Sequence, residues 1–268
     1  MPKSRGERIA ELAAFVLAAC VFLVLYAPVM VSAVFSVFET RAGKILWDTF
    51  TLRYYLTLWS NESVMDALTY TALVAVAAAA LASIAAVGLA LYAQWPGAVG
   101  RNALTLIIYL PFLLPPIVTG LSLLVGSANA GLDRGIMTVV VGHTIFVLAV
   151  AYRLVLTRLQ ALPPSMIEAS FDLGASRWST LRYVLLPHLG SAILTGALLA
   201  LTLSFDETLI SSFVAGDRMT LPLRLWAMMR VGFTPEINAL VTLVLLVSIA
   251  LALVSARLLK PAGESEED

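Results

Sequence analysis

Residues 67–100, ALTYTALVAVAAAALASIAAVGLALYAQWPGAVG, form an uninterrupted uncharged stretch, and this stretch decides the fold class of the chain. A helix needs roughly 18 to 20 predominantly apolar residues to cross about 30 Å of hydrocarbon. In that medium a helix pairs its backbone N–H and C=O groups internally, whereas an irregular segment leaves them unpaired. We therefore expect residues 67–100 to contain a membrane-spanning α-helix.

Five more uncharged runs of comparable length occur in the chain. They cover residues 12–38, 102–132, 135–152, 183–205 and 237–256. Of the 268 residues, 60% are hydrophobic and 13% are charged, whereas a soluble domain is about half apolar and about a quarter charged. The sequence thus predicts an all-α fold, an integral membrane bundle of six transmembrane helices that forms a single domain over residues 1–268.

The positive charges predict the orientation of these helices. The run 12–38 follows three positive charges, but it exceeds the roughly 7 to 15 apolar residues of a signal peptide, so we expect a retained first helix. Loops on the cytoplasmic side carry an excess of Lys and Arg. With the N-terminus inside, the cytoplasmic segments hold ten of the 17 Lys and Arg residues, which predicts two cytoplasmic termini: Lys3, Arg5, Arg8, Arg101, Arg153, Arg158, Arg177, Arg182, Arg257 and Lys260.

Small residues and prolines mark two features of the predicted helices. Small side chains four residues apart let membrane helices approach closely, and we expect packing seams within the bundle at Ala75, Ala79, Ser83, Ala78, Ala82 and Ala86, and at Ala192, Gly196, Ala200 and Ser204. The third run is interrupted. The interruption favours either a packing kink or the lining of a pathway, and its residues are Pro111, Pro115, Pro116 and Gly120.

The chain lacks the motifs of catalysis. It has no G-x-x-x-x-G-K-[ST] loop for ATP, no H-E-x-x-H and no G-x-S-x-G. Its formal net charge is zero, so no basic field attracts nucleic acid. Cys20 is the only cysteine, which rules out an intrachain disulfide. The sequence therefore predicts a non-catalytic protein without a cofactor, a metal site or a nucleic acid partner.

Three ionisable residues are candidates for a substrate pathway. His143 lies within a predicted span, where an ionisable group is a functional candidate, although a neutral imidazole bonded to a neighbouring helix explains it as well. Asp206 and Glu207 follow the fifth run side by side. Adjacent carboxylates attract a polycation, and the alternative is a solvated helix end.

Residues 153–188 form the one long polar excursion in this half of the chain, and we expect them in the cytoplasm. Ser165 and Glu168 have the spacing of a capping box at the start of a short helix. Gly174 stands where a helix end favours a left-handed residue. Ser176 can begin a second helix, which we expect to end before Pro187. The excursion is therefore predicted to be a helix, a glycine turn and a helix.

Ile167 and Phe171 are four residues apart in the first of these short helices. Such residues share a helix face. Two large apolar side chains on one exposed face indicate a contact surface for another protein. We therefore expect a partner protein to cover Ile167 and Phe171.

The motif in this excursion is specific. Glu168, Ala169 and Ser170, then Gly174, then Leu186 and Pro187 match the pattern E-A-A, three residues, G, nine residues, I, one residue, L-P, with Ser170 for Ala and Val184 for Ile. The segment resembles the EAA loop of bacterial ABC-importer permeases. The resemblance implies a type I permease fold and a loop that docks into a cleft of a separate ATPase subunit. The implied coupling residues are Ile167, Glu168, Ala169, Ser170, Phe171, Gly174, Leu186 and Pro187.

The likeness extends through LTLSFDETLISSFVAG (201–216), TLPLRLWAMMRVG (220–232) and PEINAL (235–240), which are similar to the second permease subunit of spermidine/putrescine importers. It implies a polyamine substrate, a second permease subunit in a heterodimer, two ATPase subunits, an extracytoplasmic solute-binding protein and residence among the lipids of the bacterial inner membrane. Related permeases serve other small solutes, which stays as an alternative.

An ion-coupled secondary transporter is the competing class of protein. In such a transporter His143, or Asp206 with Glu207, would carry protons. Secondary transporters commonly contain internal repeats, and we detect no repeat between the two halves of this sequence. The chain has a predicted docking loop but no ATP-binding motif of its own, and this combination favours the importer permease.

Overall fold

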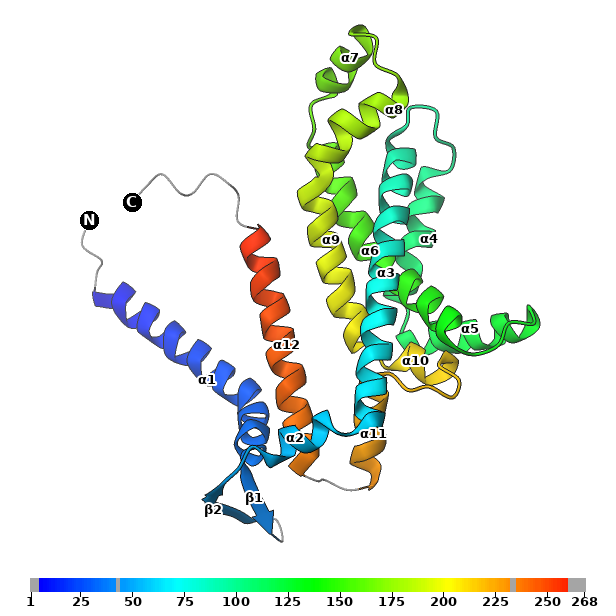
Figure 1. The fold of residues 1–268 in the computed structure, drawn as a ribbon. Helices are drawn as coiled ribbons and strands as arrows, with labels where there is room; N and C mark the ends of the chain where they lie inside the picture. The colour runs from blue at the N-terminus through cyan, green and yellow to red at the C-terminus, as the bar shows by residue number, and fades with distance from the viewer. Residues whose placement is uncertain (1–4, 42–43, 232–234, 260–268) are drawn as a thin grey trace. The chain divides into compact units, whose positions relative to one another are not determined.

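The computed structural model describes residues 5–41, 44–231 and 235–259, and most of them are helical (Figure 1). The chain forms two compact units, Met1–Glu62 with Ala227–Val247 and Ser63–Trp226 with Ser248–Asp268. The elements, in order, are α1 (Arg5–Phe35), β1 (Phe38–Arg41), β2 (Lys44–Phe50), α2 (Arg53–Trp59), α3 (Glu62–Gln94), α4 (Arg101–Leu113), α5 (Pro116–Asn129), α6 (Ile136–Gln160), α7 (Pro164–Asp172), α8 (Arg177–Thr180), the π-helical segment η1 (Leu181–Leu185), α9 (Leu186–Asp206), α10 (Leu209–Val214), α11 (Leu221–Val231) and α12 (Pro235–Leu259).

The first unit contains a hairpin that the sequence analysis does not predict. Strands β1 and β2 pair antiparallel directly after α1. The ring of Phe38 contacts Trp47 and Phe50 edge to face, at centroid distances of 5.4 and 6.0 Å. The hydroxyls of Ser36 and Tyr55 lie 2.7 Å apart and join the end of α1 to α2. Strands of 4 and 7 residues are too short to form a long apolar run, so the spans predicted from such runs do not include them.

Four helices among the described residues, α1, α3, α6 and the helix that ends with α9, are long and apolar enough to cross a membrane. Helices α4 and α5 together pass the same test as a bent pair, which makes up to five spans among the described residues if the pair crosses as one broken span and is not a re-entrant loop. The sixth predicted span coincides with α12, a helix of 25 residues that begins with the apolar stretch Pro235–Ala250. The all-α membrane fold is thus confirmed; single helices match four of the six predicted spans, and the bent pair corresponds to a fifth.

The predicted packing seams lie in the second unit. On α3, all six small residues of the two predicted stripes are buried. On α9, Gly196 faces α6, where a Cβ atom would stand 3.3 Å from the Cα of Ala151. Close approach of α6 and α9 therefore depends on the missing side chain at Gly196. These residues are seams within one bundle, as expected.

The interruption of the third run is a sharp bend. Helix α4 ends at Leu113, α5 begins at Pro116, and their axes differ by 107°. Leu114 and Pro115 are extended, because a proline disfavours helical backbone in the residue before it and donates no N–H. Pro111 stays within α4 and Gly120 within α5, so the break lies at Leu114 and Pro115.

The short helices after α6 differ in two ways from the prediction. Helix α7 begins at Pro164 with Pro163 as its N-cap, so Ser165 lies inside the helix and the capping box with Glu168 is wrong. The fixed φ of proline suits the first helical position, so the helix starts two residues earlier than predicted, with Pro163 and not Ser165 as the N-cap. The second helix does not end before Pro187, because α8 continues through η1 into α9. Pro187 follows η1 almost directly, so the N–H that it lacks falls where the hydrogen-bond pattern changes from π-helical to α-helical.

Candidate functional site

The turn between α7 and α8, residues 173–175, is built by Gly174. Its φ is +80°, as predicted for this glycine. The N–H of Ala175 donates to the carbonyl of Ser170 at 3.0 Å, and the N–H of Gly174 donates to that of Phe171 at 2.9 Å. This pair of bonds is a Schellman helix end. A Cβ at Gly174 would meet no described heavy atom within 4 Å, so the backbone conformation alone requires glycine here.

The inner side of the loop joins α7 to α8. The hydroxyls of Ser170 and Thr180 are both buried and lie 2.9 Å apart. Ser170 Oγ also donates to the carbonyl of Ile167 at 2.7 Å. On α8, Ser176 accepts the N–H of Ser179 at 3.2 Å and acts as the N-cap, as predicted. The Ser170 that departs from the E-A-A pattern thus supplies a bond between the two short helices.

The outer side of the loop differs from the predicted Ile167 and Phe171 pair. Ile167 is half-buried and packs against the hydrophobic core of the second unit. Phe171 is exposed, Leu173 is 89% exposed and Trp178 is exposed. We call Phe171, Leu173 and Trp178 the docking surface. Ile167 therefore anchors α7, while the three side chains of the docking surface offer apolar area to a partner protein.

A contact outside the motif holds α8 against the connection between α3 and α4. The guanidinium of Arg177 lies over the ring of Trp95, 4.8 Å from its centroid. Arg101 donates a hydrogen bond to the carbonyl of Trp95. Farther along, Arg158 Nε of α6 donates to the carbonyl of His188 at 3.1 Å. The docking surface is thus attached to the bundle through several helices.

Short helix α10 lies at the other end of α9, away from α7 and α8 (Figure 1). A Cβ at Gly120 of α5 would stand 3.1 Å from the Cα of Ile210 and 2.8 Å from the ring of Phe213. A Cβ at Gly142 of α6 would stand 2.8 Å from a methyl group of Ile210. Helix α10 therefore packs tightly against both α5 and α6.

His143 fixes α10 in this place. The side chain is 1% exposed. Its Nδ1 lies 2.8 Å from Ser204 Oγ on α9, and its Nε2 lies 2.8 Å from Ser211 Oγ on α10. A neutral imidazole has one donor and one acceptor nitrogen, which satisfies both contacts. His143 thus joins α6, α9 and α10 through its hydrogen bonds. This agrees with the alternative of a neutral imidazole bonded to a neighbouring helix.

The two adjacent carboxylates occupy different environments. Glu207 is 8% exposed, and its Oε1 accepts the N–H of Ile210 at 2.9 Å, so it caps the start of α10. Asp206, the last residue of α9, is exposed. The alternative of a solvated helix end therefore fits Asp206 and fails for Glu207, because the chain turns directly after Asp206.

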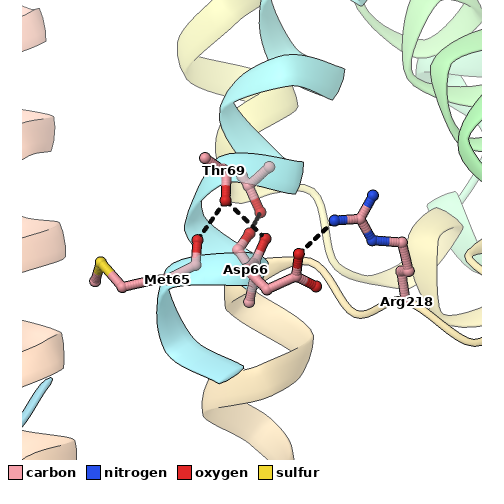
Figure 2. Close-up of polar contacts among 6 residues, drawn as sticks. Met65, Asp66, Thr69 and Arg218 are labelled. Atoms are coloured by element: carbon pink, nitrogen blue, oxygen red, sulfur yellow. Dashed lines mark hydrogen bonds and ion pairs between the residues drawn. The ribbon is translucent and has the colours of Figure 1, made fainter. Parts of the chain in front are cut away.

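The segment after α10 is bound to α3. Arg218 forms an ion pair with Asp66, as Figure 2 shows, and its guanidinium lies 4.8 Å from the ring centroid of Tyr70. Next to this pair, the N–H of Leu221 donates to Thr71 Oγ1 at 2.7 Å. Sequence reasoning missed α10 and these contacts. The sequence signal for α10 is Thr208, an N-cap type of residue that stands directly before Leu209.

A bundle of membrane-spanning helices with an exposed helix–glycine–helix loop defines the class of importer permeases. The chain belongs to the family of binding-protein-dependent transport system inner membrane components, whose model matches residues 86–262. It is 37% identical over 235 residues to the putrescine transport system permease protein PotI of Escherichia coli (strain K12), covering 84% of this chain and 82% of that one. It is 32% identical over 238 residues to the spermidine/putrescine transport system permease protein PotC of Haemophilus influenzae, covering 88% and 91%.

A solved structure has the same fold. A chain of a bacterial ABC transporter involved in the import of the acidic polysaccharide alginate superposes with a TM-score of 0.76 at 17% identity, covering 97% of this chain and 100% of that one. The predicted type I permease fold is therefore confirmed. The chain is a multi-pass inner membrane protein of a transport system, and its relatives are permease subunits, which are non-catalytic.

Proposed function

We propose that this chain is the transmembrane permease subunit of an ABC importer that moves a polyamine, spermidine or putrescine, across the inner membrane. The observation that carries the proposal is the loop, in which a left-handed Gly174 sets two short helices and exposes the docking surface. The named substrates of PotI and PotC support the substrate class. A secondary transporter works without an ATPase subunit, so in that class of protein the docking surface would have no role.

The partners follow from the loop and the family. Two separate ATPase subunits drive transport, a second, different permease completes the pathway, and an extracytoplasmic solute-binding protein delivers the substrate. The coupling loop, residues 153–188 of one permease domain, contacts the ATPase. In this loop Ile167 and Ser170 position α7. Phe171 faces the ATPase, together with Glu168 and Ala169. Gly174 sets the turn, and Leu186 and Pro187 set the entry into α9.

The experiment that tests this function uses the whole transporter. The tagged chain is purified with its partners and reconstituted into proteoliposomes with the binding protein and radiolabelled putrescine. We expect an ATPase to copurify and uptake to require ATP. Uptake that follows a proton gradient without ATP would identify a secondary transporter. If the transporter takes up another solute with ATP, and takes up neither putrescine nor spermidine, the permease role stands and the polyamine assignment is wrong.

The orientation of the chain is the first prediction. Both termini and the coupling loop lie in the cytoplasm in this proposal, as the positive charges favour. In a Cys20→Ala background, a cysteine replacing Ser176 should react with an impermeant maleimide only from the cytoplasmic side. A cysteine replacing Thr57 of α2 should react only from outside. Labelling of Ser176→Cys from outside would contradict both the orientation and the docking of the loop.

The substrate pathway passes Asp206 in this proposal, while Glu207 and His143 shape it by holding α10. The second prediction therefore separates the two carboxylates. Asp206→Asn removes an exposed charge and should slow putrescine uptake without loss of assembly. Glu207→Gln keeps an acceptor for the N–H of Ile210 and should assemble normally, whereas Glu207→Ala loses a cap of about 1 kcal/mol and should assemble less well. Uptake and complex yield are measured in parallel, and unchanged uptake in Asp206→Asn removes Asp206 from the pathway.

A further inference from the structure

A cavity of about 730 Å³ lies in the second unit, at the bend between α4 and α5 and beside α6. Its volume falls within the roughly 300–1,000 Å³ of small-molecule sites. The wall is largely apolar, with Leu114 from the bend, Leu123 from α5, and Met137 and Ile145 from α6. The wall is therefore suited mainly to the methylene groups of a ligand.

The lining has five polar side chains, and two of them, Thr119 and Asp133, give the cavity a preference; the other three are Ser122, Ser127 and Thr138. Asp133, an exposed residue, is the one acidic residue among those that line the cavity. Thr119 of α5 is 8% exposed, and its Oγ1 is buried with no hydrogen-bond partner among the described residues. A buried hydroxyl without a partner carries a free-energy cost, which a ligand donor removes. The lining thus offers one negative charge and one unpartnered hydroxyl, which can accept or donate a hydrogen bond.

The loop that carries Asp133 is held on three sides. The N–H of Leu132 donates to the carbonyl of Ser127 on α5 at 2.8 Å, and Thr138 Oγ1 on α6 donates to the carbonyl of Asp133 at 2.9 Å. The N–H of Gly135 donates to the carbonyl of Val214 on α10 at 3.0 Å. The carboxylate is therefore carried by an ordered backbone that depends on α10.

The chemistry of the lining selects among ligands. A carboxylate repels anions, including the phosphate of a lipid headgroup. A sugar needs many free hydrogen-bonding groups, and here the hydroxyls of Ser127 and Thr138 already donate to backbone carbonyls. An ammonium group on a methylene chain matches all three features, because its charge pairs with the carboxylate, its N–H groups donate and its methylenes contact the wall.

We propose that this cavity binds an aliphatic amine, with one ammonium group against Asp133, an N–H donated to Thr119 Oγ1 and the methylene chain along α5 and α6. The proposal rests on the proposed function, and it names a substrate site within the permease. In the predicted orientation the loop of Asp133 lies at the extracytoplasmic side, where a binding protein would release its solute.

The test is protection from labelling in the assembled transporter. In a Cys20→Ala background, Ser122→Cys places a thiol in the cavity lining. Putrescine should slow its reaction with a maleimide, and Asp133→Asn should raise the half-protecting putrescine concentration about tenfold or more, as expected for a hydrogen bond to a charged group. Asp217→Asn, which removes an exposed carboxylate outside this lining, should leave that concentration unchanged. Thr119→Val should raise it less than Asp133→Asn does.

Three outcomes overturn the proposal. Equal protection in the parent and in Asp133→Asn means that Asp133 does not hold the amine. Equal labelling with and without putrescine, in a transporter that imports putrescine, means that the amine passes elsewhere and leaves the proposed function standing. A thiol that never reacts means that lipid or the second permease fills the cavity. Failure of the proposed function is distinct, because the parent transporter then imports no polyamine.

Discussion

Gly174→Val should strongly reduce transport while leaving the membrane bundle folded. Gly174 has a φ of +80°. For a β-branched residue such a backbone is a genuine outlier, and the left-handed conformation costs an L-residue about 1–2 kcal/mol. A new Cβ meets no described atom within 4 Å, so the chain relieves the strain by changing the turn. The docking surface then points elsewhere, and we expect uptake to fall about tenfold or more.

The control variant at the same position is Gly174→Asn. Asparagine visits the left-handed region more readily than other residues, so this variant should keep most of the uptake despite a larger side chain. Three measurements separate the causes: yield of the permease in membranes, copurification of the ATPase, and uptake in proteoliposomes. Normal uptake by Gly174→Val would show that the turn is not the coupling element.

The loop also shows where sequence reasoning about the site ends. The left-handed glycine and the N-cap at Ser176 follow from local backbone chemistry, and both are found. Whether Ile167 or Leu173 faces a partner depends on how α7 packs against the bundle, which no local pattern contains. Asp206 and Glu207 are adjacent in sequence, yet the end of α9 between them leaves one exposed and makes the other a cap.

The fold divides in the same way. Long apolar runs predict spans because the energy of transfer into lipid sums over composition and needs no tertiary contact. The prolines at the bend predict a break, but the angle of 107° between α4 and α5 depends on their neighbours. The six residues of α10 are held by Gly120, Gly142 and His143, which are distant in sequence. Tertiary contacts of this kind leave little signal in a single sequence.

Gly196→Leu should break the seam between α6 and α9 and deplete the folded permease. A Cβ at Gly196 would stand 3.3 Å from the Cα and 3.6 Å from the carbonyl oxygen of Ala151. Both are backbone atoms of a long helix, so they cannot rotate away as a side chain can, and the helices must separate. Overpacking of a tight contact costs about 1–3 kcal/mol or more. In a membrane this loss is severe, because helix association depends on close van der Waals packing.

A matched control lies on the same helix. Gly190 of α9 is exposed, and a Cβ there would meet none of the atoms that the structure describes within 4 Å. Gly190→Leu gains about 1 kcal/mol of helix propensity over glycine, as Gly196→Leu also does, so the two variants differ only in the contact with α6. In detergent, the melting temperature and the monodisperse fraction of the complex should fall for Gly196→Leu and hold for Gly190→Leu. Equal melting temperatures would mean that α6 and α9 do not rely on this close approach, because the propensity gain is common to both variants.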